Sequence, residues 1–568
     1  MKMKIVIVGG VAAGASAAAR LRRLDEHAEI IVFEQGAHVS FSNCSLPYHL
    51  SGVVADSDSL VMMTPESFRT RHAVDVRTNT QVISIDRGRK TVRVRSLISE
   101  EEYEESYDRL ILATGAKPVL PRSIQGIGRS NVHVIRNVGD IVKIRRAFDD
   151  PAVTRIGIVG GGFIGIETAE NARKAGKDVT LIEGTDQVLA PFDEEMAQIL
   201  HKELDDHGVQ LHLRTRVQEI EEDGIIAVRD GQTLRIPCDL VIMAVGVQPD
   251  TALAVQAGLQ IGESGGIRVD HNAQTSDPDI YAIGDVAERF NALTHHPGRL
   301  ALAGPAQRQA RAAADHICGR QHSEHGFIGS SCIRVFDQNA AVSGLSEKAA
   351  KAAGIPCDSV LIFPNDKVSL MPECHYMAFK LIFEVPTGRI LGAQAIGRGE
   401  CDKRINVIAA MITMHASLED LKELELCYAP QYSTAKDVVN QAALVALNVL
   451  YGEVRQVHVQ DVRALAESGA CIIDVREPGE YARGHLRSAK NIPLSQLRER
   501  MAEIPSDRPV YLHCRSSQRS YYALRCLQGN GYRNVFNISG SFLGICLYEH
   551  FRDQHEGRTP IVTAYCFD

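Results

Sequence analysis

Short apolar runs, separated by glycine turns and amphipathic stretches, open the chain. The segments KIVIV, GGVAAG, ASAAARLRRL and EIIVF predict a buried strand, a turn, a helix and a second parallel strand that leads to Glu34. The same order returns in RIGIVGGGFIGIETAENARKAGKDVTLIEG, where the second strand leads to Glu183. The pattern therefore predicts an α/β fold with two βαβ units.

The pattern of predicted strands and helices changes from about residue 325. Strands such as AFKLIFEV alternate there with helices such as INVIAAMITM, which predicts an α+β domain that ends near residue 450. The stretch GEVRQVHVQ is interpreted as a short polar connector. A helix-like segment and the apolar run ACIIDVRE follow this connector. They predict a separate C-terminal domain.

Composition narrows the class of protein. A chain of 568 residues is too long for one hydrophobic core. Its net charge of -8 is mild for this length and argues against nucleic acid as a partner. The 13 cysteines have no metal-binding spacing, so no metal site is expected, and their scatter favours a reducing, cytoplasmic location.

The basic, apolar start is also typical of a signal peptide, but the complete strand–turn–helix pattern favours a folded domain, and no membrane partner is expected.

The first glycine turn has the features of a dinucleotide site. Gly9 allows a tight turn, Gly10 follows it, and Gly14 allows the helix to pack closely on the strand. The usual middle glycine of G-x-G-x-x-G is Val11 here, a departure from the motif. Backbone N–H groups and the helix N-terminus are still expected to hold a pyrophosphate. Glu34 is placed to accept hydrogen bonds from ribose hydroxyls.

The second glycine turn matches the motif fully, with Gly160, Gly162 and Gly165 between a strand and a helix. Glu183 follows the next strand, where a carboxylate binds a free 2′-hydroxyl and repels a 2′-phosphate. This favours NADH over NADPH. Glu167, in the first helical turn, is a candidate contact for a flavin or a nicotinamide, or simply a carboxylate favoured by the helix dipole.

Three further motifs connect the first site to a flavin. They are ATG (Ala113, Thr114 and Gly115), YAIGD with Gly284 and Asp285, and AGPAQRQARAAAD. Together with the glycine turns they resemble the pyridine-nucleotide-disulfide oxidoreductases. The resemblance implies a discontinuous FAD-binding domain, an inserted NADH-binding domain and a dimerisation domain, and therefore FAD, NADH and a homodimer. The expected ranges are 1–115 with 246–324, 116–245, and 325–450.

A single cysteine, Cys44, lies in FSNCSLPYHL. Disulfide-reducing members of this family carry a second cysteine five positions later, where this chain has His49. Cys44 cannot then cycle as an internal disulfide. It must form either a sulfenic acid or an adduct with an external thiol, as a mixed disulfide or a persulfide.

The surroundings of Cys44 resemble the site where coenzyme A disulfide reductases bind coenzyme A (CoA). The implied CoA contacts are Arg20 and Arg23, with Arg22 on the same helix, and Ser40 and Asn43. A solvated basic helix face is the alternative interpretation of these arginines. In YAPQYSTAKD, Tyr428 and Tyr432 match tyrosines that reach the partner subunit's cysteine in this family.

One segment departs from the CoA pattern. The family's Tyr-Tyr-Pro-Gly segment corresponds to SLMPE, with Leu370 and Met371, so one active-site hydroxyl is expected to be missing. Loss of a proton donor slows the release of a poor leaving thiolate. A persulfide is then favoured over a CoA disulfide as the substrate.

The last part of the chain, residues 456–568, resembles a rhodanese domain through IIDVREPGEYARGHLRSAKNIP and VYLHCRSSQRSYYALRCL. In the loop from Cys514 to Arg519, backbone N–H groups are expected to form an anion cradle that favours the thiolate. Ser517 occupies a position that is often glycine. Asp474 and Arg476 are expected to brace the loop.

The whole pattern resembles CoA disulfide reductases with a rhodanese extension, also called NADH-dependent persulfide reductases. It implies NADH-dependent reduction of CoA persulfide, polysulfide or CoA disulfides through Cys44 on a flavoprotein, with Cys514 handling sulfane sulfur. Two alternatives stay open. One is an NADH oxidase or peroxidase that cycles through a sulfenic acid, and the other is a redox-sensing NADH-binding protein.

Overall fold

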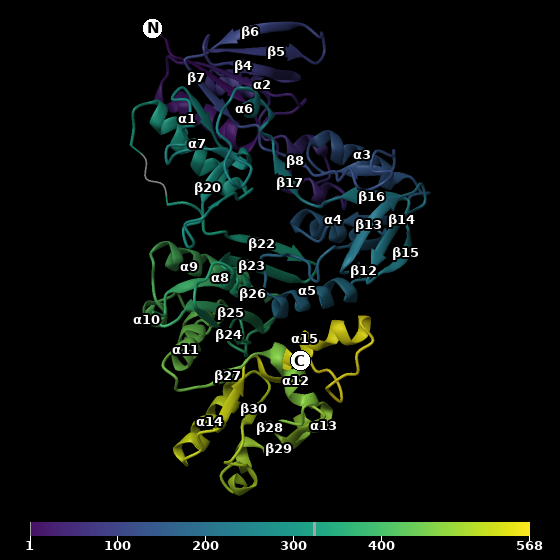
Figure 1. Cartoon of the computed structure of the whole chain (residues 1–568), viewed down its shortest axis with the longest axis vertical. Coiled ribbons are helices and arrows are strands. Elements are labelled where there is room, and N and C mark those ends of the chain that lie inside the picture. Colours follow the sequence, from purple (N-terminus) through teal and green to yellow (C-terminus); the bar gives the residue numbers. More distant parts are fainter. Residues whose placement is uncertain (1, 322–324, 568) are drawn as a thin grey trace. The chain divides into compact units, whose positions relative to one another are not determined.

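The computed structural model describes residues 2–321 and 325–567 (Figure 1). The predicted domain ends at residues 1, 324 and 568 lie outside this part. The chain forms two compact units, Met1–Thr185 with His212–Phe327, and Asp186–Leu211 with Ile328–Asp568. Within the described residues, no helix has the length and apolar character needed to cross a bilayer.

A five-stranded parallel sheet forms the core of the first unit, in the order β19-β7-β1-β2-β3. The strands are β1 (Lys4–Val8), β2 (Glu29–Phe33), β3 (Asp75–Arg77), β7 (Arg109–Leu112) and β19 (Ile280–Ala282). Helices α1 (Ala12–Leu24) and α7 (Ala303–Ile317) pack on each other, with buried alanines and Leu21 in the core beside the sheet. Because β7 and β19 pair directly, the segment between them in sequence is an excursion from this sheet.

That excursion contains a second parallel sheet, in the order β12-β11-β10-β16-β9. Its strands are β9 (Val132–Val134), β10 (Arg155–Val159), β11 (Asp178–Ile182), β12 (Val209–His212) and β16 (Leu240–Met243), with helices α3 (Val138–Asp149) and α4 (Phe163–Lys174). The excursion leaves and returns through β8 (Ala116–Pro118) and β17 (Val247–Pro249), which pair antiparallel. Two small antiparallel sheets are attached to this unit: β4 (Thr80–Asp86), β5 (Thr91–Ser96) and β6 (Glu102–Ser106), and β13 (Thr215–Ile220), β14 (Gly224–Arg229) and β15 (Gln232–Pro237).

The second unit contains an antiparallel sheet in the order β22-β23-β26-β25-β24. Its strands are β22 (Ser331–Val335), β23 (Gln338–Gly344), β24 (Cys357–Ile362), β25 (Met377–Glu384) and β26 (Ile390–Gly397). The helices of this part are α8 (Glu347–Ala352), α9 (Cys401–Thr413), α10 (Leu418–Glu423) and α11 (Val438–Leu450). β25 and β26 are buried almost along their whole length, as the apolar run AFKLIFEV predicts.

A buried lysine fixes helix α5 (Glu194–Asp206) within the second unit. Lys380, on β25, is 1% exposed, and its Nζ lies 2.9 Å from Asp193, 2.5 Å from Glu195 and 2.8 Å from Glu347. Burial alone lowers the pKa of a lysine, but these carboxylates raise the pKa of Lys380 above its ordinary value. A buried charge of this kind is tolerated only when it is fully paired.

The last part of the second unit is a parallel sheet in the order β27-β31-β30-β28-β29. Its strands are β27 (Gln456–Val457), β28 (Cys471–Asp474), β29 (Ala489–Asn491), β30 (Val510–His513) and β31 (Val535–Ile538). The helices are α12 (Val462–Glu467), α13 (Pro478–Arg483), α14 (Gln518–Gly529) and α15 (Ser541–His555). Helix α15 packs on α5, where Arg552 pairs with Glu194 and His555 lies 3.1 Å from Asp205.

The prediction of a simple connector at GEVRQVHVQ is wrong. Gln456 and Val457 form the edge strand β27, paired with Asn537 and Ile538 of β31. The pattern is too short and too polar to show periodicity, because an edge strand of two residues buries little side-chain surface. The predicted alternation of two parallel α/β sheets, an α+β domain and a further C-terminal α/β domain is confirmed.

Candidate functional site

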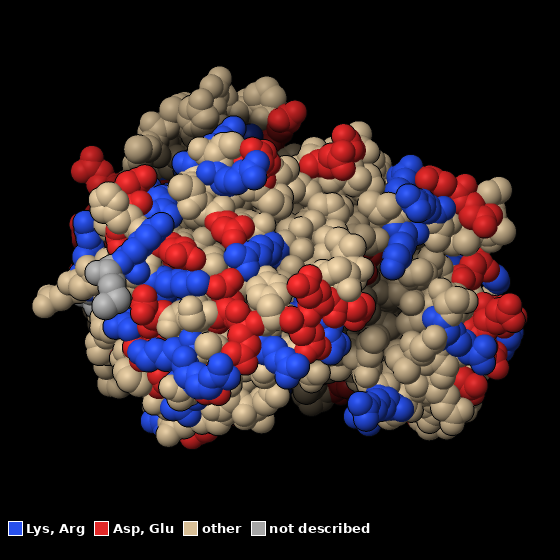
Figure 2. All heavy atoms as spheres, turned by 90° about the horizontal axis from the view of Figure 1, so that it is seen from above, with Lys and Arg blue, Asp and Glu red and all other residues tan. Residues whose placement is uncertain are grey.

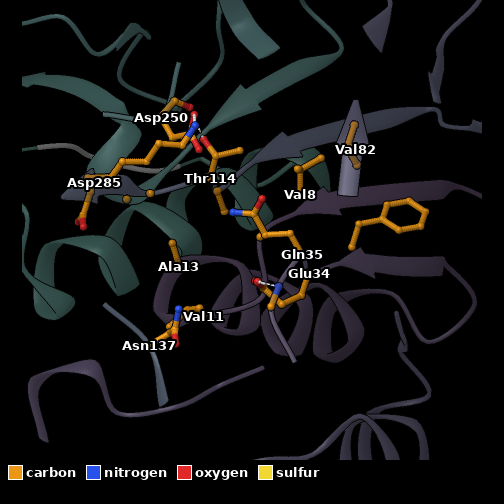
Figure 3. A pocket seen from close by; sticks show the side chains of 18 of the residues that line it. Val8, Val11, Ala13, Glu34, Gln35, Val82, Thr114, Asn137, Asp250 and Asp285 are labelled. Carbon is orange, nitrogen blue, oxygen red and sulfur yellow. Dashed lines mark hydrogen bonds and ion pairs between the residues drawn. The ribbon is translucent and has the colours of Figure 1, made fainter. Parts of the chain in front are cut away.

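A cavity of about 510 Å³ opens at the carboxyl ends of the strands of the first sheet (Figure 3). Gly9 turns the chain there with φ +101°, and a Cβ on it would lie 2.2 Å from the Ala113 carbonyl oxygen. A Cβ on Gly14 would lie 1.8 Å from the Gly9 carbonyl oxygen. Only glycine fits at either position, so helix α1 starts directly against the strand, with its N-terminus at the cavity.

Glu34 and Asp285 lie on separate sides of this cavity in Figure 3. Glu34 accepts hydrogen bonds from the N–H groups of Gly10 (2.8 Å) and Gly36 (2.7 Å), so its carboxylate holds the glycine turn. Burial raises the pKa of Asp285. The preceding Gly284 adopts φ +77° and donates its N–H to Gln309 Oε1 at 2.7 Å.

The motif residues between these two sides also line the cavity. They are Ala113, Thr114 and Gly115 after β7, and Val11 at the start of α1. Thr114 Oγ1 donates to the Asp250 carbonyl oxygen at 2.7 Å, which fastens the loop after β7 to the loop after β17. Most predicted residues of the first dinucleotide site therefore line one cavity, whereas Gly10 and Gly14 are not among its lining residues.

The second glycine turn repeats the first. A Cβ on Gly160 would lie 2.3 Å from the Ala244 carbonyl oxygen, and one on Gly165 would lie 1.9 Å from the Gly160 carbonyl oxygen. Gly162 differs, because a Cβ there would meet no described atom within 4 Å. Glu183 accepts hydrogen bonds from the N–H groups of Gly161 (2.7 Å) and Thr185 (2.8 Å), in parallel with Glu34.

Both turns fit a bound dinucleotide. Each places backbone N–H groups and a helix N-terminus at the end of a parallel strand, where a pyrophosphate binds. Gly162 leaves open space where a ligand would approach the backbone. Residues of the first cavity would hold FAD, and Gly160, Gly162, Gly165 and Glu183 would hold NADH.

Cys44 lies in a short 3₁₀ turn, Asn43–Ser45, and is exposed. Partial burial of the thiol by nearby protein, together with the negative charges of Glu167 and Asp285, raises the pKa of Cys44. His49, in the position of the missing second cysteine, is buried, and its Nδ1 lies 2.7 Å from the Val54 carbonyl oxygen. His49 is therefore a structural residue.

A tyrosine joins the Cys44 segment to helix α4. Tyr48 Oη donates to Glu167 Oε1 at 3.4 Å. Burial raises the pKa of Glu167 to about 7, although the tyrosine bond opposes that shift. Tyr48 was missed at the sequence level. Its spacing of four residues from Cys44, within a predicted loop, was the available signal.

The arginines predicted to bind CoA have different environments. Arg20 donates to Asp315 of α7 at 2.6 Å and is mostly buried. Arg22 is 8% exposed, and its guanidinium donates to the backbone carbonyls of residues 25, 26, 28, 72 and 73. Arg22 is thus structural, whereas Arg23 is exposed. The solvated-face interpretation fits neither Arg20 nor Arg22.

Ser40 and Asn43 lie at the start of the Cys44 segment, in the first unit. Ser40 adopts a left-handed conformation with φ +49°. Asn43 is exposed and lines the cavity.

The predicted tyrosines Tyr428 and Tyr432 belong to the second unit. They are 51% and 61% exposed, in the loop between α10 and α11. Arg404 Nη2 donates to the Tyr432 carbonyl oxygen (3.2 Å) and pairs with Asp437, which fixes the backbone of that loop. Leu370, at the position where a tyrosine was expected, is 84% exposed.

Cys514 follows β30 and is 1% exposed. Its N–H donates to Ser541 Oγ at 3.3 Å. Ser517 adopts φ +77°, the left-handed conformation that favours glycine, and its hydroxyl is held by the Ile538 carbonyl oxygen (3.2 Å) and Ser541 (3.1 Å). These hydrogen bonds explain how serine occupies a position that is often glycine.

One ion pair holds the end of the Cys514 loop, and a second lies at the end of β28, beside the strand that leads into the loop. Arg519 forms a bidentate pair with Glu480 of α13, at 2.6 and 2.7 Å. Arg476 and Asp474 form a buried pair at 2.7 Å, and the Arg476 guanidinium lies 4.0 Å from the ring centroid of Phe542. Glu480 was missed at the sequence level, because a partner on another element leaves no local pattern.

One group of potential metal ligands is present among the described residues: Glu203, His207 and Asp337, whose ligand atoms lie within 4.8 Å of one another. Glu203 Oε1 already accepts the Asp337 N–H at 2.9 Å, and Arg398 lies 3.7 Å from the Asp337 carboxylate. These contacts account for the group without a cation, and we propose no metal there.

Comparison with known proteins places this geometry in a family. A family model described as pyridine nucleotide-disulphide oxidoreductase matches residues 3–310. The chain belongs to the pyridine nucleotide-disulphide oxidoreductase family. The family's dimerisation-domain model matches residues 331–438, and a rhodanese-like domain model matches residues 458–547.

Several relatives of this oxidoreductase are known. A coenzyme A disulfide reductase of Staphylococcus epidermidis is 31% identical over 443 residues, covering 77% of this chain and 98% of that protein. The crystal structure of reduced Bacillus anthracis CoADR-RHD has 41% identity and a TM-score of 0.94, over 98% of this chain and 99% of that one. An NAD-dependent persulfide reductase from A. fulgidus has 34% identity and a TM-score of 0.89, over 95% of this chain and 99% of that one.

These comparisons confirm the predicted family and the fold class, with its dimerisation and rhodanese domains. They also confirm an oxidoreductase that acts on sulfur and uses FAD and NAD(H).

Proposed function

We propose that this oxidoreductase uses NADH and FAD to reduce CoA persulfide, polysulfide or CoA disulfides through Cys44, with Cys514 carrying sulfane sulfur. The supporting observation is the combination of two sulfur sites in one chain. Cys44 lacks an internal partner, because His49 replaces the second cysteine, and Cys514 lies in a rhodanese-type loop. A relative named for CoA disulfide reduction matches 77% of this chain, and one named for persulfide reduction matches 95% of it.

When bound, FAD takes two electrons from NADH and supplies them to sulfur. The protein supplies the nucleophile. The Cys44 thiolate attacks the outer sulfur of a CoA persulfide, which releases CoA thiolate and leaves a Cys44 persulfide. Two electrons and one proton then regenerate the Cys44 thiolate and release hydrogen sulfide. With CoA disulfide the same attack gives a Cys44–CoA mixed disulfide, and two electrons release the second CoA thiolate.

Substrate binding is assigned to the side chains around Cys44. Arg23, Ser40 and Asn43 would contact CoA, and Arg20 would contribute if substrate displaces its pair with Asp315. Since Leu370 and Met371 supply no hydroxyl, Tyr428 and Tyr432 of a partner subunit would be the proton donors. This arrangement favours persulfide, because hydrosulfide needs less help to leave than CoA thiolate.

The nucleotide preference follows from Glu183. Its carboxylate holds the second glycine turn through Gly161 and Thr185, and its charge would repel a 2′-phosphate. We therefore propose NADH as the reductant.

The dimerisation domain supports a homodimer, and small-molecule persulfides or disulfides are the proposed partners. The scattered positions of the 13 cysteines favour a reducing, cytoplasmic location.

Intact mass spectrometry of the unreduced protein tests the proposal. We expect a CoA-sized adduct that disappears in Cys44→Ser, and loss of NADH-dependent persulfide reduction by at least 100-fold in the same variant. Cys238→Ser, at a buried cysteine away from the motifs, is the control and keeps the adduct.

An oxidised Cys44 without CoA, together with oxygen or peroxide turnover that rivals persulfide reduction, would favour the oxidase or peroxidase. Absence of multiple turnover with every acceptor would favour the redox sensor.

A further inference from the structure

A buried hydroxyl lies beside the sulfur of Cys514. Ser520, in the first turn of α14, is 0% exposed, and its Oγ lies 3.7 Å from Cys514 Sγ. The loop sequence did not indicate this residue, because it follows the Cys-x4-Arg segment. Helix α14 begins at Gln518, and this start brings Ser520 back over the cysteine.

The hydroxyl of Ser520 has three acceptors within reach but only one hydrogen. Besides the Cys514 sulfur, they are the Asn537 Oδ1 atom at 2.7 Å and the Ser517 carbonyl oxygen at 3.0 Å. A neutral thiol is a weak acceptor, so the hydrogen then points to Asn537. A thiolate is a much stronger acceptor, because hydrogen bonds to ionised groups are roughly twice as strong as neutral ones.

We propose that Ser520 stabilises the Cys514 thiolate by turning its hydroxyl hydrogen from Asn537 to the sulfur. This inference rests on the proposed function in one respect, because the proposed function gives Cys514 its reactive role. The backbone N–H groups of the loop and the Ser520 hydroxyl would then face the thiolate from different elements. Asn537, 7% exposed on β31, holds the hydrogen while the thiol is neutral.

Alkylation of Cys514 as a function of pH tests the proposal on the flavin-loaded, full-length protein. The rate of reaction with iodoacetamide is followed by mass spectrometry of the Cys514 peptide. In Ser520→Ala, the pH at which half of the maximal rate is reached should rise by about one unit, which lowers the rate about tenfold at pH values well below the midpoint. Ser520→Thr keeps the donor and should restore the wild-type midpoint.

Asn537→Ala separates this role from a structural one. Removing Asn537 Oδ1 leaves only the Ser517 carbonyl oxygen to compete with the sulfur for the Ser520 hydrogen, so the midpoint should fall or stay, not rise. A disturbed loop would move the midpoint in the same direction in both alanine variants, and that result would overturn the proposal. A wild-type midpoint in folded Ser520→Ala would also overturn it. Ser468→Ala, at an exposed serine of the same domain, is the matched control.

Sulfur transfer is measured separately, with a persulfide donor and a thiol acceptor. If Cys514 transfers no sulfur but its alkylation still shifts as described, the role of Ser520 stands and the proposed function of Cys514 fails. If transfer occurs and the alkylation midpoint is unchanged in Ser520→Ala, the proposed function of Cys514 stands and the role of Ser520 fails.

Discussion

At the scale of single residues, Cys44 and Glu167 form an electrostatic pair. Burial and the Glu167 carboxylate both raise the pKa of Cys44, and Glu167 itself ionises at about pH 7. Repulsion of the Cys44 thiolate by Glu167 therefore begins only when the pH rises through 7. Below that pH the Glu167 carboxyl group is neutral, and its effect on the thiolate disappears.

This pair predicts a pH-dependent effect of Glu167→Gln. Removing the carboxylate should increase the alkylation rate of Cys44 about threefold at pH 8, because a larger share of the thiol is ionised. At pH 6 the variant and the wild type should react equally. Glu26→Gln, an exposed carboxylate in the same unit, serves as control. Equal rates at pH 8 would contradict the electrostatic interpretation.

At the scale of elements, the two strand–turn–helix units tolerate no side chain where the helix meets the strand. In both units the third glycine faces the carbonyl oxygen of the first, at 1.8 and 1.9 Å from a hypothetical Cβ. The middle glycine of the second turn has open space instead. The same motif thus contains two positions where only glycine fits and one position with open space beside the backbone.

Two alanine variants separate these demands. Gly165→Ala should destabilise the protein by about 1–3 kcal/mol, because helix α4 must move away from the strand. Gly162→Ala, at an extended backbone position, should keep the wild-type melting temperature and raise the KM for NADH at least tenfold. Thermal melting and steady-state kinetics measure both effects. A wild-type KM in Gly162→Ala would mean that no ligand approaches this backbone.

The elements also show what sequence patterns can predict. Both βαβ units were predictable, because buried parallel strands and glycine turns leave strong local signals. Strand β27 was not, since one polar and one apolar residue are too few to show a period. The Arg20–Asp315 and Arg519–Glu480 pairs join distant or separate elements, so no spacing reveals them. Of the candidate site, the sequence therefore indicated the turns, both cysteines and several residues near them, but not Tyr48, Glu480 or Ser520.

At the scale of the whole molecule, basic and acidic residues lie interspersed on the face that Figure 2 shows, with wide uncharged areas between them. Within the second unit, the C-terminal domain packs against helix α5 and strand β24. Phe551 of α15 lies against His201 of α5, with ring centroids 5.2 Å apart, and Ser539 bonds the Leu361 N–H at 3.2 Å. Helix α5 is thus covered by the C-terminal domain.

This packing predicts that removal of residues 456–568 destabilises the remaining chain. The shortened protein should melt several degrees below the full chain, because apolar surface on α5 and β24 becomes exposed. Differential scanning fluorimetry measures the change, with full-length Cys514→Ser as the control that keeps the domain. An unchanged melting temperature would show that the contact contributes little stability.

Strand β27 also limits how such proteins can be recombined. The polar stretch that follows α11 looks like the natural place to exchange one C-terminal domain for another. A junction after Val457 would take β27 from one protein and β31 from the other. The edge strand would then come from a different sequence than the sheet that it pairs with. The Arg455 carbonyl oxygen already accepts the Asn537 N–H of β31 at 2.8 Å, and Val454 packs in the apolar core that contains Cys514, so the junction must lie at Tyr451 or Gly452. A chimera with its junction there would inherit a complete fold around Cys514, and one joined a few residues later would not.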